Sequence, residues 1–237
     1  MKKELSVIIP AYNEEENLAP TVISVVDYLT LKKYAFEVIL VNDGSTDSTK
    51  ARTLELVARY PEVKLIQFEK NQGKGKAVKA GVAAARRELC LFMDADNATT
   101  IQEWDKFETC FQQGAQAVVA SRHLAASQIA HPQPWIRRFL GTGYRFLCRR
   151  WFGMRVSDFN CGFKAYRTPL AQKIYAQNVM DDWTFDAEVF CRMKKEKIPF
   201  VEVPVRWTHQ QKKSEGLPFK TAFKTLGSLR RLKRLFP

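Results

Sequence analysis

The sequence lacks the features of a disulfide-stabilised, zinc-binding or membrane-spanning protein. Its five cysteines include no Cys-x-x-Cys pair and no histidine at metal-ligand spacing. Because an odd number of cysteines does not complete a disulfide framework, we expect reduced cysteines that fill the core. No charge-free apolar run approaches the roughly 18 residues that a transmembrane helix requires, so we predict no transmembrane helix.

Two further absences concern the N-terminal region. The first apolar run breaks at Pro10 and turns acidic, which makes it too short for a signal peptide. We therefore expect a cytoplasmic protein, at most peripheral at the inner face of a membrane. The stretch that follows, PAYNEEEN, contains no glycine. This argues against sugar-nucleotide synthesis, which would use a glycine-rich phosphate loop after the first strand.

The sequence does contain a large apolar fraction and a concentrated positive charge. With 237 residues, 46% of them hydrophobic, the chain is most simply one domain. The net charge of +13 is concentrated in Pro134–Gly153, with five arginines and no acid, and after Gln211, with eight basic residues against Glu215 alone. Aromatic and leucine residues interleave both segments, which favours helices lying on an anionic membrane surface. The alternative is a solvated basic face over ordinary core helices.

Short apolar runs alternate with segments of helical periodicity as far as residue 122. The runs are rich in β-branched residues, as strands are: Leu5–Pro10, Phe36–Asp43, Val63–Phe68, Leu89–Asp96 and Ala115–Arg122. The helical segments between them are residues 15–29, 45–60, 73–87 and 100–113. This alternation predicts an α/β fold in which helices cover a parallel sheet. Ligands of such sheets bind at the carboxyl ends of the strands.

Polar clusters follow each predicted strand. Asp94 and Asp96 stand one residue apart at the end of the fourth run, where two like charges require a cation or fixed hydrogen-bond donors nearby. Each cluster by itself also fits an ordinary role, such as helix capping by Asn13 or Asp43. A non-enzymatic nucleic-acid or membrane-binding module would explain the basic charge but not these carboxylates, and we expect no nucleic-acid partner.

In combination the clusters resemble a known family. PAYNEEENL, VNDGSTDST, NQGKGKAVKAG, DADNATT and SRH occur in the order and at the separations typical of the family-two inverting nucleotide-sugar glycosyltransferases. Two later stretches, DFNCGFKAY (Asp158–Tyr166) and DWTFDAEV (Asp182–Val189), are similar to the polyprenyl-phosphate branch, and to its dolichyl-phosphate glucosyltransferases more than its mannosyl ones. The resemblance implies a Rossmann-like glycosyltransferase-A fold with a mostly parallel sheet. It covers residues 4–210, so we expect a catalytic domain over residues 1–211 and a basic amphipathic segment over residues 212–237.

The resemblance also implies a donor site. The nucleotide-sugar-binding residues would be Pro10, Ala11, Tyr12, Glu14, Asp43, Lys74, Asp94, Ala95 and Asp96. The Asp-Ala-Asp triplet would bind Mg²⁺ or Mn²⁺ together with the diphosphate, with Asp96 as the direct ligand and Asp94 beside it. Relatives offer an amide ligand two residues later, where this chain has Ala98 after Asn97, which leaves the third ligand open.

For the acceptor, the resemblance implies a polyprenyl phosphate whose oxygen is already anionic, so a strong general base is dispensable. Arg122 is the first candidate to bind this phosphate, and Arg137, Arg138 and Lys213 are the next. Asp186 is the candidate base, with Glu188 second, although the pair also fits a helix-lining role.

The implied reaction is metal-dependent, inverting transfer of a hexose from UDP-glucose, or GDP-mannose as the alternative. The competing hypothesis is a family-two enzyme with a soluble saccharide or protein acceptor.

Overall fold

The computed structural model of the chain describes residues 3–131, 134–210 and 218–237. Its centre is a seven-stranded sheet in the order β3-β2-β1-β4-β7-β5-β8. The bounds of these strands are β1 (Glu4–Ala11), β2 (Ala35–Asn42), β3 (Val63–Gln67), β4 (Leu89–Met93), β5 (Ala117–Ser121), β7 (Phe163–Arg167) and β8 (Val201–Pro204). A separate two-stranded sheet pairs β6 (Gln128–His131) with β9 (Arg206–Thr208). All five strands expected from the apolar runs form, which confirms the predicted α/β fold.

The sheet is mostly parallel, with one exception. β7 runs antiparallel to both of its neighbours, β4 and β5, whereas the other neighbouring pairs are parallel. β7 was not predicted, because the alternation of strands and helices was followed only as far as residue 122; Lys164 interrupts the apolar pattern of this strand. That lysine is fully buried, and the strand lies inside the sheet, between β4 and β5.

Helices cover both faces of the sheet and bury two apolar layers. They are α1 (Leu18–Leu31), α2 (Thr49–Arg59), α3 (Lys74–Ala84), α4 (Trp104–Gln112), α5 (Trp135–Phe152), α6 (Thr168–Ala176), α7 (Phe185–Lys195) and α8 (Pro218–Leu235), with the short 3₁₀ helix η1 (Ile101–Glu103) before α4. Residues of α1, α2 and α4 fill one layer. Residues of α3, α6 and α7 fill the other. The two layers leave the strand ends as the open edges of the fold.

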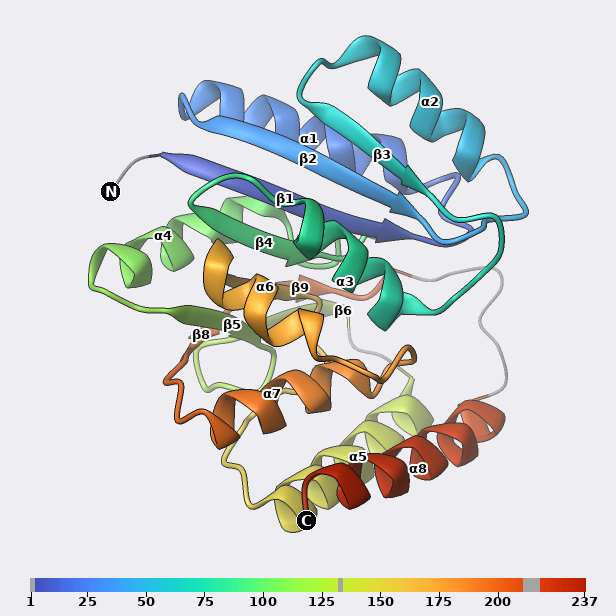
Figure 1. Cartoon of the computed structure of the whole chain (residues 1–237), viewed down its shortest axis with the longest axis vertical. Helices are drawn as coiled ribbons and strands as arrows, with labels where there is room; N and C mark the ends of the chain where they lie inside the picture. The colour runs from blue at the N-terminus through green and yellow to red at the C-terminus, as the bar shows by residue number, and fades with distance from the viewer. Residues whose placement is uncertain (1–2, 132–133, 211–217) are drawn as a thin grey trace.

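The two basic segments form helices that pack on each other. α5 and α8 lie side by side at the end of the molecule away from α1 and α2 (Figure 1). Leu229 and Leu232 of α8 are buried in the same apolar layer as Cys148 and Phe152 of α5. Among the described helices, none is long and apolar enough to cross a membrane.

Candidate active site

The carboxyl ends of β1, β2 and β4 meet at one edge of the sheet, because these three strands are neighbours and parallel. The loops after them carry the polar clusters found in the sequence. Asp43, which follows β2, connects the end of β1 with the loop after β3. Its amide donates to the Ala11 carbonyl at 2.9 Å, and its carboxylate accepts from the amides of Gln72 (2.7 Å) and Gly73 (3.0 Å) before α3. The predicted site residues of the first three loops are therefore brought together.

Asp94 has a protein cation beside it. Lys74, the first residue of α3, places its Nζ 2.5 Å from Asp94 Oδ1, and the two side chains are 17% and 28% exposed. Burial disfavours the charged lysine, but Asp94 and then Asp186 outweigh burial and raise the pKa of Lys74. Lys74 therefore already compensates the charge of Asp94, and the binding of a metal ion by Asp96 with Asp94 beside it stays a prediction.

The turn that follows Asp94 is held by its own backbone and by a distant strand. Asp96 Oδ1 accepts from the Ala98 amide at 3.1 Å, and Asn97 adopts a left-handed conformation with φ of 55°. The Ala98 carbonyl in turn accepts from the amide of Thr208, the last residue of β9, at 2.9 Å. His209 is the residue after Thr208 and therefore lies close to the acidic turn. The sequence did not predict this proximity.

The predicted nucleotide-binding residues of the first loop differ in exposure. Tyr12 is 44% exposed at the end of β1, so its ring is open to a base or ribose. Glu14 is 7% exposed and accepts from the Asn17 side chain at the start of α1. Pro10, Ala11 and Ala95 are buried, and Thr21 donates to the Ala95 carbonyl at 2.8 Å. Buried side chains leave only main-chain atoms of these three for a ligand.

Arg122 is paired within the protein. Its Nε lies 2.7 Å from Asp158 Oδ2 and its second guanidinium nitrogen lies 2.9 Å from Oδ1, which is a bidentate ion pair. The ring of Trp207 packs against the same guanidinium, with the centroid at 5.3 Å. A phosphate at Arg122 would have to share the cation with Asp158, so the predicted acceptor role stays a prediction.

Asp186 also has a buried partner. Lys164 Nζ lies 2.5 Å from Asp186 Oδ1. Burial is the largest influence on Asp186 and raises its pKa, and the nearby Lys164 and Lys74 reduce this shift. Glu188, in contrast, accepts from the amides of Val179 and Met180 and from Arg192. Glu188, the second candidate base, therefore holds the loop before α7 in place. This fits the structural alternative given for the pair in the sequence.

The remaining acceptor candidates lie on α5 or outside the described residues. Arg138 is exposed and Arg137 is half-buried in the first turn of α5. Lys213 lies outside the described residues. Among the described residues, no group of three or more His, Cys, Asp or Glu side chains is arranged to hold a metal ion.

Sequence reasoning missed Trp183, which the fold brings to this edge, and it indicated Gly162 only as a glycine that allows close approach of the backbone. The Trp183 ring centroid lies 4.4 Å from Lys74 Nζ. Gly162 lies so close to Asp94 that a Cβ at this position would be 1.9 Å from Asp94 Oδ2. Both belong to motifs noted in the sequence, but Lys74 and Asp94, which they contact, are distant in the chain and no local pattern identifies them as the partners.

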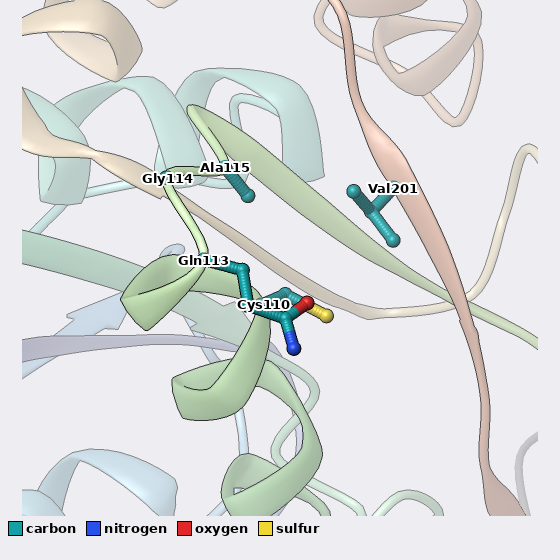
Figure 2. A pocket seen from close by; sticks show the side chains of 5 residues that line it. All are labelled: Cys110, Gln113, Gly114, Ala115 and Val201. Atoms are coloured by element: carbon teal, nitrogen blue, oxygen red, sulfur yellow. The ribbon is translucent and has the colours of Figure 1, made fainter.

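A shallow hollow lies away from this edge. Figure 2 shows that residues at the end of α4, before β5 and at the start of β8 line it: Cys110, Gln113, Gly114, Ala115 and Val201. Ala115 precedes β5 and Val201 begins β8, so the hollow is at the amino ends of these strands. It contains none of the charged residues described above, and the carboxyl edge is the candidate site.

The sequence model of the family described as Glycosyl transferase family 2 matches residues 6–175. The chain belongs to this family. Among curated relatives of this family 2 glycosyltransferase, the dolichyl-phosphate beta-glucosyltransferase of Mus musculus is 34% identical over 224 residues, which are 87% of this chain and 68% of that protein. One from Trichomonas vaginalis is 33% identical over 211 residues, which are 84% of this chain and 62% of that protein. The chain thus spans about two thirds of the length of these relatives.

Solved structures agree with the fold of the glycosyltransferase. Glucosyl-3-phosphoglycerate synthase from Mycobacterium tuberculosis, in complex with phosphoglyceric acid, superposes with a TM-score of 0.69 at 16% identity, covering 97% of this chain and 80% of that one. The same enzyme in complex with Mn²⁺, UDP-glucose and phosphoglyceric acid gives a TM-score of 0.66 at 15% identity, covering 98% and 80%. At this identity the likeness establishes the glycosyltransferase-A fold alone.

Proposed function

We propose that this glycosyltransferase transfers a hexose, with glucose favoured, from a nucleotide sugar to a polyprenyl phosphate with inversion of the anomeric centre. The observation that carries the proposal is the convergence of Lys74, Asp94 and Asp96 at the carboxyl edge of the sheet in a chain whose relatives are named dolichyl-phosphate beta-glucosyltransferases. Basic side chains and carboxylates at one edge fit a diphosphate and its metal ion.

The donor is proposed to bind across the first three loops. Tyr12 would stack on the base or ribose, Asp43 would accept from nucleotide hydroxyl or N–H groups, and Lys74 would face the diphosphate. UDP-glucose is favoured over GDP-mannose, because the relatives are named as glucosyltransferases and a structural neighbour was solved with UDP-glucose.

The acidic turn fits Mg²⁺ or Mn²⁺ bound jointly with the donor. Mg²⁺ is typically held by one or two carboxylates together with substrate phosphates and water, and Asp96 and Asp94 supply that number of hard oxygen ligands. Asp96 is the better direct ligand, because Lys74 already pairs with Asp94. When bound, the ion would neutralise the departing diphosphate.

The acceptor phosphate is proposed to lie between the donor edge and α5. A phosphate monoester is ionised near neutral pH, so positioning by cations matters more than a base. Arg138 is an exposed cation of α5, with Arg137 beside it, and Arg122 could join if a phosphate displaces part of its contact with Asp158. Asp186 remains the candidate base.

The acceptor lipid is proposed to reach the enzyme along α5 and α8. Trp135, Phe139 and Phe146 of α5 are 74%, 73% and 66% exposed, and Phe223 of α8 is 78% exposed. Arginines lie near the aromatic residues of α5, and Lys224 follows Phe223, a pattern typical of helices in a membrane interface. We therefore place the enzyme at the inner, cytoplasmic face of a membrane, with residues 1–211 as the catalytic domain and residues 212–237 as the surface-associated segment.

The test is a transfer assay. Purified protein is incubated with a panel of radiolabelled nucleotide sugars, a polyprenyl phosphate and Mg²⁺ or Mn²⁺, and label is measured in the organic phase. We expect extractable label from UDP-glucose. Label that stays in the aqueous phase as a new saccharide would instead support the soluble-acceptor alternative, and absence of product for every donor would remove the lipid assignment.

A further inference from the structure

Trp183 is a half-exposed aromatic residue beside three buried ones. Its exposed fraction is 50%, whereas Thr184, Phe185 and Asp186 are at most 1% exposed. Its ring lies against a cation: Lys74 Nζ is 4.4 Å from the ring centroid and 2.5 Å from Asp94 Oδ1. The ammonium of Lys74 is therefore held between a carboxylate and an indole.

The loop that carries Trp183 is hydrogen-bonded to α3 and to α8. The Asp181 carbonyl accepts from the Gly75 amide of α3 at 2.8 Å. Asp182 accepts from the Thr184 amide at 2.9 Å and from Ser228 of α8. These bonds tie the indole to the helix that begins at Lys74 and to the C-terminal helix.

Two glycines let this loop approach α3 closely. A Cβ at Gly73 would lie 2.3 Å from the Asp181 carbonyl oxygen, and one at Gly75 would lie 2.4 Å from the Met180 carbonyl oxygen. Gly73 also has φ of 99°, which glycine adopts without strain. The Gly-Lys-Gly sequence therefore brings the Lys74 ammonium and the Trp183 ring to the same place.

Trp183 differs from the other aromatic contact of Lys74. Phe92 lies 5.3 Å from the ammonium, but its ring is 1% exposed and packs in the apolar layer. Half of Trp183 remains open to solvent at the edge where the donor is proposed to bind, so core packing does not account for its position. A cation–π contact of this kind is worth about 0.5–2 kcal/mol.

We propose that Trp183 is a positioning residue of the donor site, which holds the Lys74 ammonium where the diphosphate of a nucleotide sugar binds. This inference rests on the proposed function. The indole restricts the flexible lysine side chain before the donor arrives, so that less conformational freedom is lost on binding. Trp183 acts through Lys74 and not on the reacting atoms.

The experiment measures binding of UDP-glucose with Mg²⁺ by calorimetry. Trp183→Leu keeps an apolar side chain without the ring, and Trp183→Phe keeps an aromatic face. We expect about ten-fold weaker donor binding in W183L and about three-fold or less in W183F. We expect no change in donor affinity in Trp135→Leu, which removes a more exposed tryptophan (74%) from α5. Thermal unfolding confirms that each variant is folded.

A double-mutant cycle separates positioning from an independent contact. If Trp183 acts through Lys74, the K74A/W183L double variant binds the donor no more weakly than K74A alone. Additive losses, or wild-type affinity in W183L, would overturn the inference while leaving the proposed function intact. Absence of binding of any nucleotide sugar to the wild-type protein would overturn both.

Discussion

Lys164 of β7 and Asp186 of α7 form an ion pair that is closed to solvent, with 2.5 Å between Nζ and Oδ1 and exposed fractions of 0% and 2%. Removing one partner leaves a buried charge without compensation, which costs about 3–5 kcal/mol. We therefore expect Lys164→Met and Asp186→Asn each to lower the free energy of unfolding by about that amount, and the double variant to recover most of the loss. Urea denaturation measures all four proteins, and additive losses would contradict the coupling.

The same variants test Asp186 as a general base. Loss of a base lowers the rate by about 10²–10⁴-fold, and restoring stability with K164M would not repair that loss. Because a phosphate acceptor is already ionised, we expect the double variant to keep transfer within about ten-fold of the wild type. A rate at least about 10²-fold below the wild type in both D186N and the double variant would identify Asp186 as the base.

The ion pair between Asp158 and Arg122 is predicted to make the stability of the fold depend on pH in the acidic range. Burial disfavours the charged carboxylate, but the Arg122 guanidinium outweighs burial and holds the pKa of Asp158 well below its ordinary range. A lowered folded-state pKa gives stability that is present above the unfolded pKa of about 3.9 and is lost as the pH falls through the folded value. We expect the stability gap between wild type and Asp158→Asn to be largest near pH 7 and to narrow below about pH 4. A gap that stays constant down to pH 2 would contradict this.

Most of the sheet and the position of the site could be predicted from the sequence because both depend on local patterns. The runs of β-branched residues predicted the five strands β1 to β5. Because neighbouring strands of an α/β sheet are parallel, the same pattern predicted that Asp43 and Asp94 lie at one edge. β7 was not predicted, because the alternation was followed only as far as residue 122 and its apolar pattern is interrupted by Lys164, whose charge is compensated by a residue in a different element. A local pattern carries no information about such a partner.

The same limit applies within the site. The two acids of the fourth loop indicated a missing positive charge, and a metal was the simplest source. Lys74, 20 residues earlier, proved to be the partner of Asp94. Arg122 was predicted to bind the acceptor phosphate, and its ion pair with Asp158, 36 residues later, was not foreseen. Ion pairs between loops depend on tertiary contacts that spacing does not reveal.

The exposed aromatic face of α5 is predicted to bind membranes. Replacing Trp135, Phe139 and Phe146 with serine removes the apolar surface and leaves the arginines, so we expect at least about ten-fold weaker binding to anionic vesicles, with folding retained. Leu54→Ser is the control, since Leu54 is 51% exposed on α2. Deleting α8 is a poorer test because it removes the buried Leu229 and Leu232. Unchanged vesicle sedimentation of the triple variant would refute the proposed surface.

Metal binding is predicted to require the nucleotide. Since the protein offers two carboxylates and one of them pairs with Lys74, we expect Mn²⁺ to bind at least about ten-fold more tightly in the presence of UDP. Asp96→Ala should abolish this increase with the fold retained. Calorimetric titration of Mn²⁺ with and without UDP measures it, and equal affinities would show that metal and donor are not linked.

Gly162 is predicted to determine the position of the Asp94 carboxylate. Its carbonyl accepts from the Asp94 amide at 3.0 Å, and an added Cβ would lie 1.9 Å from Asp94 Oδ2. Gly162→Ala must therefore turn the carboxylate away from Lys74, because the side chain moves more easily than the strand. We expect donor affinity to fall by at least about ten-fold, with only a small change in the unfolding temperature.

Gly141→Ala on α5 is the matched control, since nothing lies within 4 Å of its added Cβ, and alanine favours the helix. Wild-type donor affinity in G162A would show that the contact between Lys74 and Asp94 is not needed for binding.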